Sequence, residues 1–172
     1  MACPLAASAS RWAILGTLPV TISDAAGAVE IRPFLRRHLE RVLTIENACF
    51  PREAYPRELF LELHRDCGRH FFVARKSRRI VGYAVASVGD QDAEIVSIAV
   101  LPDHRRAGVA TALLRHILSR LPRARVGLLT LMVRTDNLAA IRFYRGFGFR
   151  AAGRIARYYE DRSDGLLMRK RL

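Results

Sequence analysis

Residues 98–114 read IAVLPDHRRAGVATALL, and this stretch decides the fold. An apolar run ends at Val100, a polar turn follows, and apolar residues then recur at helical spacing from Gly108 to Leu121. The first turn of a helix offers backbone N–H groups without internal partners, and a glycine beside them lets a ligand approach closely. Because the helix dipole also favours negative charge there, the stretch predicts a strand–turn–helix unit that binds an anion.

The flanking segments continue this alternation of strand and helix patterns. The turns near residues 76–79 and 89–92 are short, which predicts an antiparallel meander between residues 70 and 100. The expected order is β-α-α-β-β-β-α-β-α-β-β, a mixed, mostly antiparallel sheet of the α/β (α+β) class rather than a doubly wound parallel sheet. The predicted strands are residues 29–32, 70–75, 80–88, 93–100, 126–133, 149–158 and 165–171, and the predicted helices are residues 35–49, 59–68, 108–121 and 137–146.

The length of 172 residues predicts one domain, over residues 29–172. Residues 1–28 differ in composition, with small side chains and a short apolar patch that Gly16 and Pro19 interrupt. A signal peptide would need a basic start and a longer apolar run. We therefore expect residues 1–28 to be an N-terminal extension with little regular structure.

The formal net charge of +13 indicates an anionic partner, which could be a phosphorylated cofactor, nucleic acid or an acidic protein surface. Nearly all of this charge is arginine, since Lys76 and Lys170 are the only lysines. The three cysteines, Cys3, Cys49 and Cys67, have no paired spacing and are interpreted as reduced thiols of a cytoplasmic protein. The histidines are scattered, so no metal site is expected. No membrane association is expected either.

Two motifs resemble those of the GNAT acetyltransferases. The Q/R-x-x-G-x-G/A acetyl-CoA motif of that family is matched by Arg105, Gly108 and Ala110. Residues 137–149, NLAAIRFYRGFGF, resemble its N-x-x-A-x-x-x-Y-x-x-x-G-F helix. The resemblance covers roughly residues 29–171 and implies a GNAT fold of about seven strands and four helices. It further implies transfer of an acetyl group from acetyl-CoA to a primary amine.

The resemblance also implies which residues hold acetyl-CoA. The backbone of Ile98, Ala99 and Val100 would bond the pantetheine arm, and Asn137 and Tyr144 would contact the cofactor as well. The pyrophosphate would be cradled by Arg105, Arg106, Ala107, Gly108, Val109, Ala110 and Thr111.

Acetyl transfer needs a neutral amine, and a proton for the leaving thiolate. Tyr144 is the candidate proton donor. In RimI-type ribosomal-protein acetyltransferases the base is a glutamate five residues before the motif asparagine, but Met132 stands there in this chain. Glu94 lies where histone-type members of the family carry their glutamate base, so we expect Glu94 to replace it.

The acceptor side resembles that of protein N-terminal acetyltransferases. Phe50, Pro51 and Tyr55 resemble their F-P-x-x-Y segment with one extra residue, and Tyr158 and Tyr159 resemble their paired tyrosines. An α-amine with a pKa of about 8 costs roughly 1.4 kcal/mol to deprotonate at pH 7, against about 4.6 kcal/mol for a lysine amine. A chain without the usual glutamate is therefore expected to acetylate a protein or peptide N-terminus.

Two alternatives remain open at this point. The acceptor could be a small-molecule amine, for which the acidic residues Glu160, Asp161 and Asp164 would favour a polycation. Alternatively, the chain could be a non-catalytic CoA-binding module that docks through arginine on RNA, the ribosome or another acidic partner. The second alternative lacks RNA-binding signatures, because no RRM-type aromatic motif is present.

Overall fold

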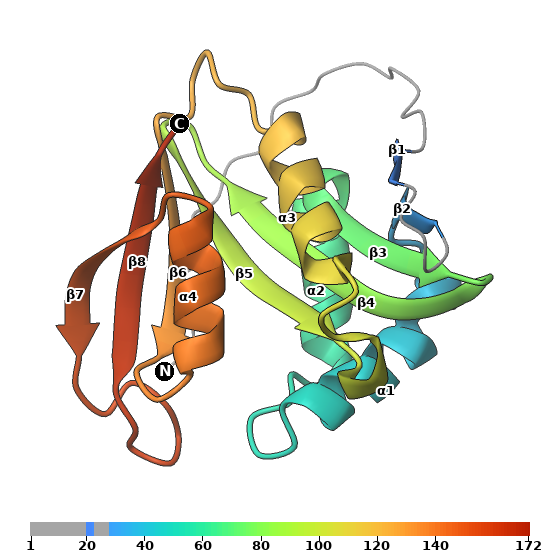
Figure 1. The fold of residues 1–172 in the computed structure, drawn as a ribbon, viewed down its shortest axis with the longest axis horizontal. Helices are drawn as coiled ribbons and strands as arrows, with labels where there is room; N and C mark the ends of the chain where they lie inside the picture. The colour runs from blue at the N-terminus through green and yellow to red at the C-terminus, as the bar shows by residue number, and fades with distance from the viewer. Residues whose placement is uncertain (1–19, 23–27) are drawn as a thin grey trace.

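The computed structural model describes residues 20–22 and 28–172 of the chain. Eight strands form one sheet in the order β1-β2-β3-β4-β5-β6-β8-β7 (Figure 1). All neighbours are antiparallel except β5 and β6, which run parallel. The strands are β1 (Val20–Ile22), β2 (Val29–Pro33), β3 (Phe71–Lys76), β4 (Arg79–Val88), β5 (Asp92–Val100), β6 (Leu128–Arg134), β7 (Arg150–Ile155) and β8 (Gly165–Arg171).

Four α-helices flank the sheet, as predicted: α1 (Leu39–Cys49), α2 (Arg57–Cys67), α3 (Val109–Arg120) and α4 (Leu138–Gly146). The order of elements from residue 29 onward is the predicted one, which confirms the α/β (α+β) class. Strand β1, which pairs with β2 and lies within residues 1–28, was not predicted from the sequence. The remainder of that extension, residues 1–19 and 23–27, lies outside the described residues.

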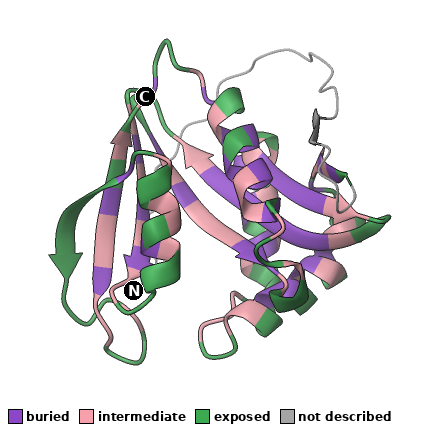
Figure 2. Cartoon of the chain, in the orientation of Figure 1, coloured by how far each residue is buried: buried purple, intermediate pink, exposed green. Residues whose placement is uncertain are grey.

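Two apolar clusters hold the helices on opposite faces of the sheet (Figure 2). Helix α3 packs through Leu113, Leu114 and Ile117 on the face that α4 shares. Helices α1 and α2 cover β3, β4 and the second half of β5 on the other face. Gly82 on β4 allows α3 to approach the sheet closely, because a Cβ added there would lie 2.8 Å from the Ala99 carbonyl oxygen and 3.3 Å from a methyl carbon of Val109 on α3.

The two parallel strands separate halfway along their length. The β5–β6 ladder ends at the pair Ile95 and Leu131, although β5 continues to Val100 and β6 to Arg134. Beyond Ile95, β5 remains paired with β4, and β6 remains paired with β8. The sheet therefore opens into a gap between the C-terminal halves of β5 and β6 (Figure 1). Among the described residues, no helix is long and apolar enough to span a lipid bilayer.

Candidate active site

The C-terminal half of β5 presents backbone groups to the gap. The N–H of Leu101 donates to the Val81 carbonyl on β4 at 2.9 Å. Backbone groups of alternate residues point to opposite edges of a strand, so those of Ile98 and Val100 point toward the gap. The side chain of Ala99 lies on the α1–α2 face, whereas Ile98 and Val100 pack toward α3.

The turn before α3 is shaped to hold an anion. Arg106 and Gly108 both adopt left-handed backbone, with φ of 63° and 74°. The first helical bond is donated by Ala112 to Gly108 at 2.9 Å, and no side chain caps the helix. The N–H groups of Val109, Ala110 and Thr111 are thus without helical acceptors, and no acidic residue lies in the first turn. Apart from its chain neighbours, no described residue has an atom within 4 Å of a Cβ built on Gly108, so the turn has room for a ligand.

Arg105 has an internal role in addition to its place in the motif. Its Nε donates to the carbonyl oxygen of Val100 at 3.2 Å, and its Nη2 lies 3.8 Å from the Cys49 Sγ. Cys49 at the end of α1 donates to the same carbonyl at 3.3 Å. These contacts fix the end of β5 against α1. Burial is the main cause that raises the pKa of the Cys49 thiol, which therefore stays protonated at neutral pH.

The second motif contributes one capping residue, Asn137, and one half-buried phenol, Tyr144. The side-chain oxygen of Asn137 accepts from the Ala140 N–H at 3.1 Å and so caps α4. Tyr144 packs against Phe143 and Phe149, with ring centroids 5.1 and 5.6 Å away. Burial raises the pKa of Tyr144, so its phenol stays protonated across the physiological range. Its hydroxyl makes no hydrogen bond with the described residues and remains available to a substrate.

Glu94 lies one residue before the point where β5 and β6 separate. It is paired with Ser87 on β4 and Thr130 on β6, so its side chain projects from the face that α1 and α2 cover elsewhere. Desolvation, followed by the charge of nearby Asp92, raises the pKa of this half-buried carboxyl. A raised pKa brings a carboxylate closer to the range in which a general base is effective.

Met132 lies on the acceptor side of the gap. A Cβ built on Gly165 would stand 2.8 Å from the Met132 Sδ and 3.0 Å from Tyr158. The thioether therefore packs close to Tyr158, at the position where a RimI-type enzyme would place its glutamate.

Arg134, at the end of β6, connects the acceptor-side segments. It donates to Glu53 at 2.6 Å and to Asp161 at 2.7 Å, and its guanidinium lies 5.1 Å from the ring centroid of Tyr159. Hydrogen bonding to Asp161 is the main cause that raises the pKa of Arg134, and the same bond lowers the pKa of Asp161. The α1–α2 segment and the β7–β8 loop are thereby held together beside the gap.

The four aromatic acceptor candidates lie on these two segments. Tyr158 and Tyr159 pack edge to face, with centroids 5.0 Å apart. Burial, and then the charges of Tyr158 and Glu53, raise the pKa of Tyr159. Tyr55 also affects that pKa, which places it near Tyr159, and Phe50 packs with Tyr55 against the apolar cluster under α1 and α2. Pro51 is exposed.

The buried carboxyl of Glu46 helps to hold the acceptor-side residue Tyr55 in place. Glu46 on α1 is 1% exposed, and its two oxygens accept from the Tyr55 N–H at 3.0 Å and from the Tyr83 hydroxyl. The Tyr83 hydroxyl also lies 2.8 Å from the Ser97 Oγ on β5. Burial is the main cause that raises the pKa of Glu46. The chain of contacts fixes Tyr55 relative to β5.

Three residues of the site were not predicted from the sequence: Glu46, Glu53 and Arg134. Glu46 could have been found, because it shares a helical face with Val42 and Ile45. No sequence signal distinguishes Glu53 or Arg134 from solvated charges. In the part of the chain that the structure describes, no three His, Cys, Asp or Glu side chains cluster as metal ligands.

A groove of about 730 Å³ runs between α3 and α4. It begins at Thr111, beside the anion-binding turn, and no acidic side chain lines it. Its basic residues are Arg115, Arg123, Arg142 and Lys170. The groove therefore continues the positive potential of the turn along the surface.

Comparisons with known proteins agree with this geometry. Residues 39–149 match the model of the acetyltransferase (GNAT) family. The N-alpha-acetyltransferase RimI of Mycobacterium tuberculosis is 34% identical over 159 residues, which cover 90% of this chain and 94% of that protein. The crystal structure of Ard1 from Thermoplasma volcanium is 34% identical, with a TM-score of 0.79 over 84% of this chain and 97% of that one. The ribosomal-protein-S18-alanine N-acetyltransferase of Escherichia coli is 28% identical, with a TM-score of 0.75 over 83% and 93% of the two chains.

Proposed function

Because the chain belongs to the GNAT acetyltransferase family, we propose that it moves an acetyl group from acetyl-CoA to the α-amine of a protein N-terminus. One observation supports the choice of acceptor. Beside the gap in the sheet, Arg134 contacts the ring of Tyr159 and hydrogen-bonds to the two segments that contain Tyr55 and Tyr158. The relatives named N-alpha-acetyltransferase support the same choice.

The described residues fit acetyl-CoA. The pantetheine arm carries amides, which would pair with the backbone of Ile98 and with the N–H of Val100 in the gap. The carbonyl oxygen of Val100 already accepts from Arg105 and Cys49. The pyrophosphate would lie on the N–H groups of residues 108–111, with Arg106 beside them. The third phosphate of CoA would then lie in the basic groove between α3 and α4. In addition to its capping role, Asn137 could use its side-chain amide nitrogen toward the cofactor.

Direct transfer then needs three proton movements. Glu94 takes one proton from the acceptor ammonium through a water molecule, and the neutral amine nitrogen then forms a bond to the thioester carbonyl carbon. As the carbon–sulfur bond breaks, Tyr144 gives a proton to the leaving thiolate, and the second proton lost by the nitrogen restores the phenol. The raised pKa values fit both roles, because Glu94 becomes a stronger base and Tyr144 remains a donor.

A peptide N-terminus fits the acceptor side chemically. It presents an amine, a first side chain and carbonyls, which suit an apolar wall of Phe50 and Pro51 beside phenolic donors. The phenols are Tyr55, Tyr158 and Tyr159. A ribosomal protein is one candidate acceptor, as in the Escherichia coli relative. The free thiols of Cys49 and Cys67 fit a protein of the cytoplasm.

A polycationic small amine is the weaker candidate. Of the acidic residues that could attract it, Asp161 is held by Arg134 and Asp164 by Arg154. The Arg157 N–H also donates to Asp164 at 2.9 Å. These carboxylates already have internal partners, so only Glu160 of the three is without an ion pair among the described residues.

Turnover on peptides and on free amines tests the proposal. Thiol release is followed with acetyl-CoA and a panel of peptides with different first residues, alongside polyamines and amino acids. We expect turnover on several peptides and little on free amines. Activity confined to free amines would reject the proposed acceptor while leaving the family assignment in place.

A further inference from the structure

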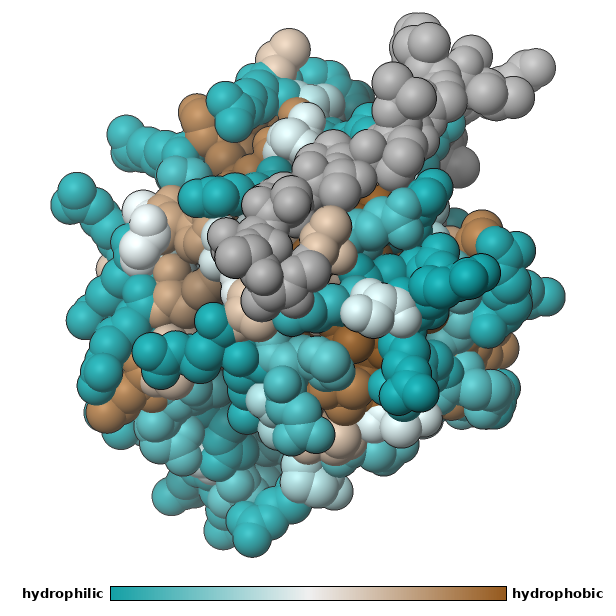
Figure 3. Space-filling model, turned by 45° about the vertical axis from the view of Figure 1, so that its right-hand side comes forward, coloured by the Kyte–Doolittle hydropathy of each residue, from teal (hydrophilic) through white to brown (hydrophobic). Residues whose placement is uncertain are grey.

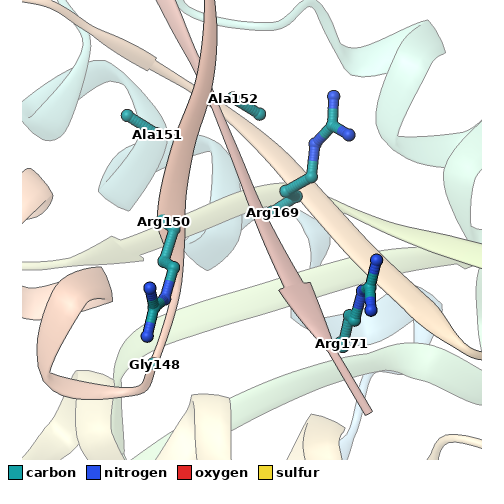
Figure 4. A pocket seen from close by; sticks show the side chains of 6 residues that line it. All are labelled: Gly148, Arg150, Ala151, Ala152, Arg169 and Arg171. Atoms are coloured by element: carbon teal, nitrogen blue, oxygen red, sulfur yellow. The ribbon is translucent and has the colours of Figure 1, made fainter.

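Three arginines surround a shallow pocket of about 560 Å³ at the edge of the sheet. Arg150 extends from β7, and Arg169 and Arg171 extend from β8 (Figure 4). Gly148, Ala151 and Ala152 complete its lining. All three arginines are exposed, as is every residue of β7 (Figure 2). We call these three side chains the edge arginines.

The edge arginines project from a part of the sheet that none of the described helices covers. Arg150 is paired with Arg169, which is paired in turn with Thr130 on β6. Their neighbour Met168 points the other way, into the core under α3 and α4. The cluster under α1 and α2 includes no residue of β6, β7 or β8, so among the described residues no helix packs on this area of the opposite face.

These positive charges are not neutralised within the described residues. Arg150 and Arg169 stand directly opposite each other, an arrangement that destabilises a sheet when the charges are alike. Six other arginines, such as Arg57 and Arg154, form ion pairs, but no edge arginine does. The acidic side chains of β5, Asp92 and Glu94, lie two strands away across β6.

We propose that the edge arginines bind the phosphate backbone of RNA. Guanidinium groups hold phosphate in two-point hydrogen bonds, and three of them on adjacent strands fit several successive phosphates. An acidic protein surface is a poorer match, because protein interfaces depend on large apolar or aromatic anchors and this pocket offers only glycine and alanine beside the arginines. Nucleic-acid interfaces are more polar and more positively charged.

The position of the patch is compatible with acetyl transfer, and the choice of RNA rests on the proposed function. Protein N-termini arise at the ribosome, where RNA covers much of the surface. The edge arginines lie at the C-terminal end of β8, whereas Tyr158 and Tyr159 precede its first residue, Gly165. Along β8, Arg169 lies four residues and Arg171 six residues beyond Gly165, about 13 and 20 Å away, so RNA on the patch leaves the acceptor site open. The face of the molecule that Figure 3 shows is mostly hydrophilic, and its apolar side chains form only small patches.

Binding to a fluorescently labelled RNA hairpin tests the proposal. Anisotropy titrations from 50 to 300 mM KCl compare the full chain with the variant Arg150→Gln/Arg169→Gln/Arg171→Gln. A matched control, Arg36→Gln/Arg37→Gln/Arg79→Gln, removes the same charge from exposed residues without ion pairs. Loss of three phosphate contacts lowers the slope of log K against log [salt] by about two to three and weakens binding at least about tenfold at 0.1 M salt.

Two results would overturn the proposal. One is an equal loss of RNA affinity in both variants, since binding would then depend on total charge alone. The other is complete displacement of the hairpin by polyglutamate at equal charge concentration, which would point to an acidic protein partner. Turnover on free peptides is measured for both variants and should stay at the wild-type rate. Because that assay contains no RNA, failure of the RNA proposal and failure of the proposed acetylation are distinguishable.

Discussion

Replacement of Gly108 by alanine separates backbone strain from loss of phosphate binding. Gly108 has φ of 74° and ψ of 0°, a left-handed conformation that costs an L-residue about 1–2 kcal/mol. For a chain of this size, 1 kcal/mol lowers Tm by roughly 2–4 °C. Apart from the chain neighbours, no described residue has an atom within 4 Å of the new Cβ, so the free protein has room for it. We therefore expect Gly108→Ala to fold, with Tm lower by roughly 2–8 °C.

The effect on CoA should be larger than this strain explains. Strain is present in both the free and the bound protein, so by itself it leaves the affinity unchanged. A methyl group over the open N–H groups would remove one or more hydrogen bonds to a charged phosphate, each worth about 1.5–3 kcal/mol. Calorimetry should show CoA affinity at least about tenfold weaker. The control is Gly127→Ala, at a glycine with open space and no left-handed backbone, which should alter neither quantity. Wild-type affinity for CoA in Gly108→Ala would refute the phosphate cradle.

Four further predictions address the gap and the residues around it. Tyr144→Phe removes a hydroxyl without a hydrogen bond among the described residues, so Tm should hold while kcat in single-turnover experiments falls about a hundredfold; an unchanged kcat would exclude Tyr144 as the acid. Burial raises the pKa of Glu94, so kcat/KM should fall as pH drops through a value above the usual glutamate range, and Glu94→Gln should remove that dependence and lower kcat about a hundredfold. Arg134→Met should raise KM for peptide at least about tenfold and leave KM for acetyl-CoA within twofold, with Arg134→Lys intermediate; parallel changes in both constants would contradict a role confined to the acceptor. Burial raises the pKa of Glu46 above 4.5, so folding favours the protonated carboxyl. The contribution of this carboxyl to the free energy of unfolding is present below pH 4.5 and is lost as pH rises through the folded-state pKa. Glu46→Gln should therefore have a higher urea midpoint than wild type at pH 8 and an equal one at pH 4.

Local pattern was sufficient for most of the elements and for the turn that precedes α3. The apolar run before Pro102, the glycine at position 108 and the helical spacing after it lie close together in the chain, so one short window reports the strand, the turn and the helix. The phenol of Tyr144 follows from the same kind of motif. Four boundaries shifted by two residues or more. The helices predicted from residues 35 and 59 begin at Leu39 and Arg57, the strand predicted from residue 126 begins at Leu128, and the strand predicted to end at residue 158 ends at Ile155.

The acceptor side depends on contacts between distant segments. Arg134 meets Glu53 across 81 positions of sequence and Asp161 across 27, and neither separation leaves a periodic trace. The strand β1 was missed for a related reason, since three residues are too few for an alternating pattern and its partner β2 decides its pairing. Arg105 has a contact role that its motif does not reveal. It is predicted as a phosphate ligand, and in the structure its side chain also contacts the Val100 carbonyl and the Cys49 Sγ.

The position of the transferred acetyl group tests the central claim most directly. The full chain is incubated with acetyl-CoA and an equimolar mixture of two peptides of one sequence. The first has a free α-amine and an internal lysine, and the second has a blocked α-amine and the same lysine. Tandem mass spectrometry then locates the added acetyl group. We predict acetylation of the first peptide at its α-amine alone and none of the second, whereas acetyl groups on the lysine of both peptides at similar rates would contradict an enzyme built for protein N-termini.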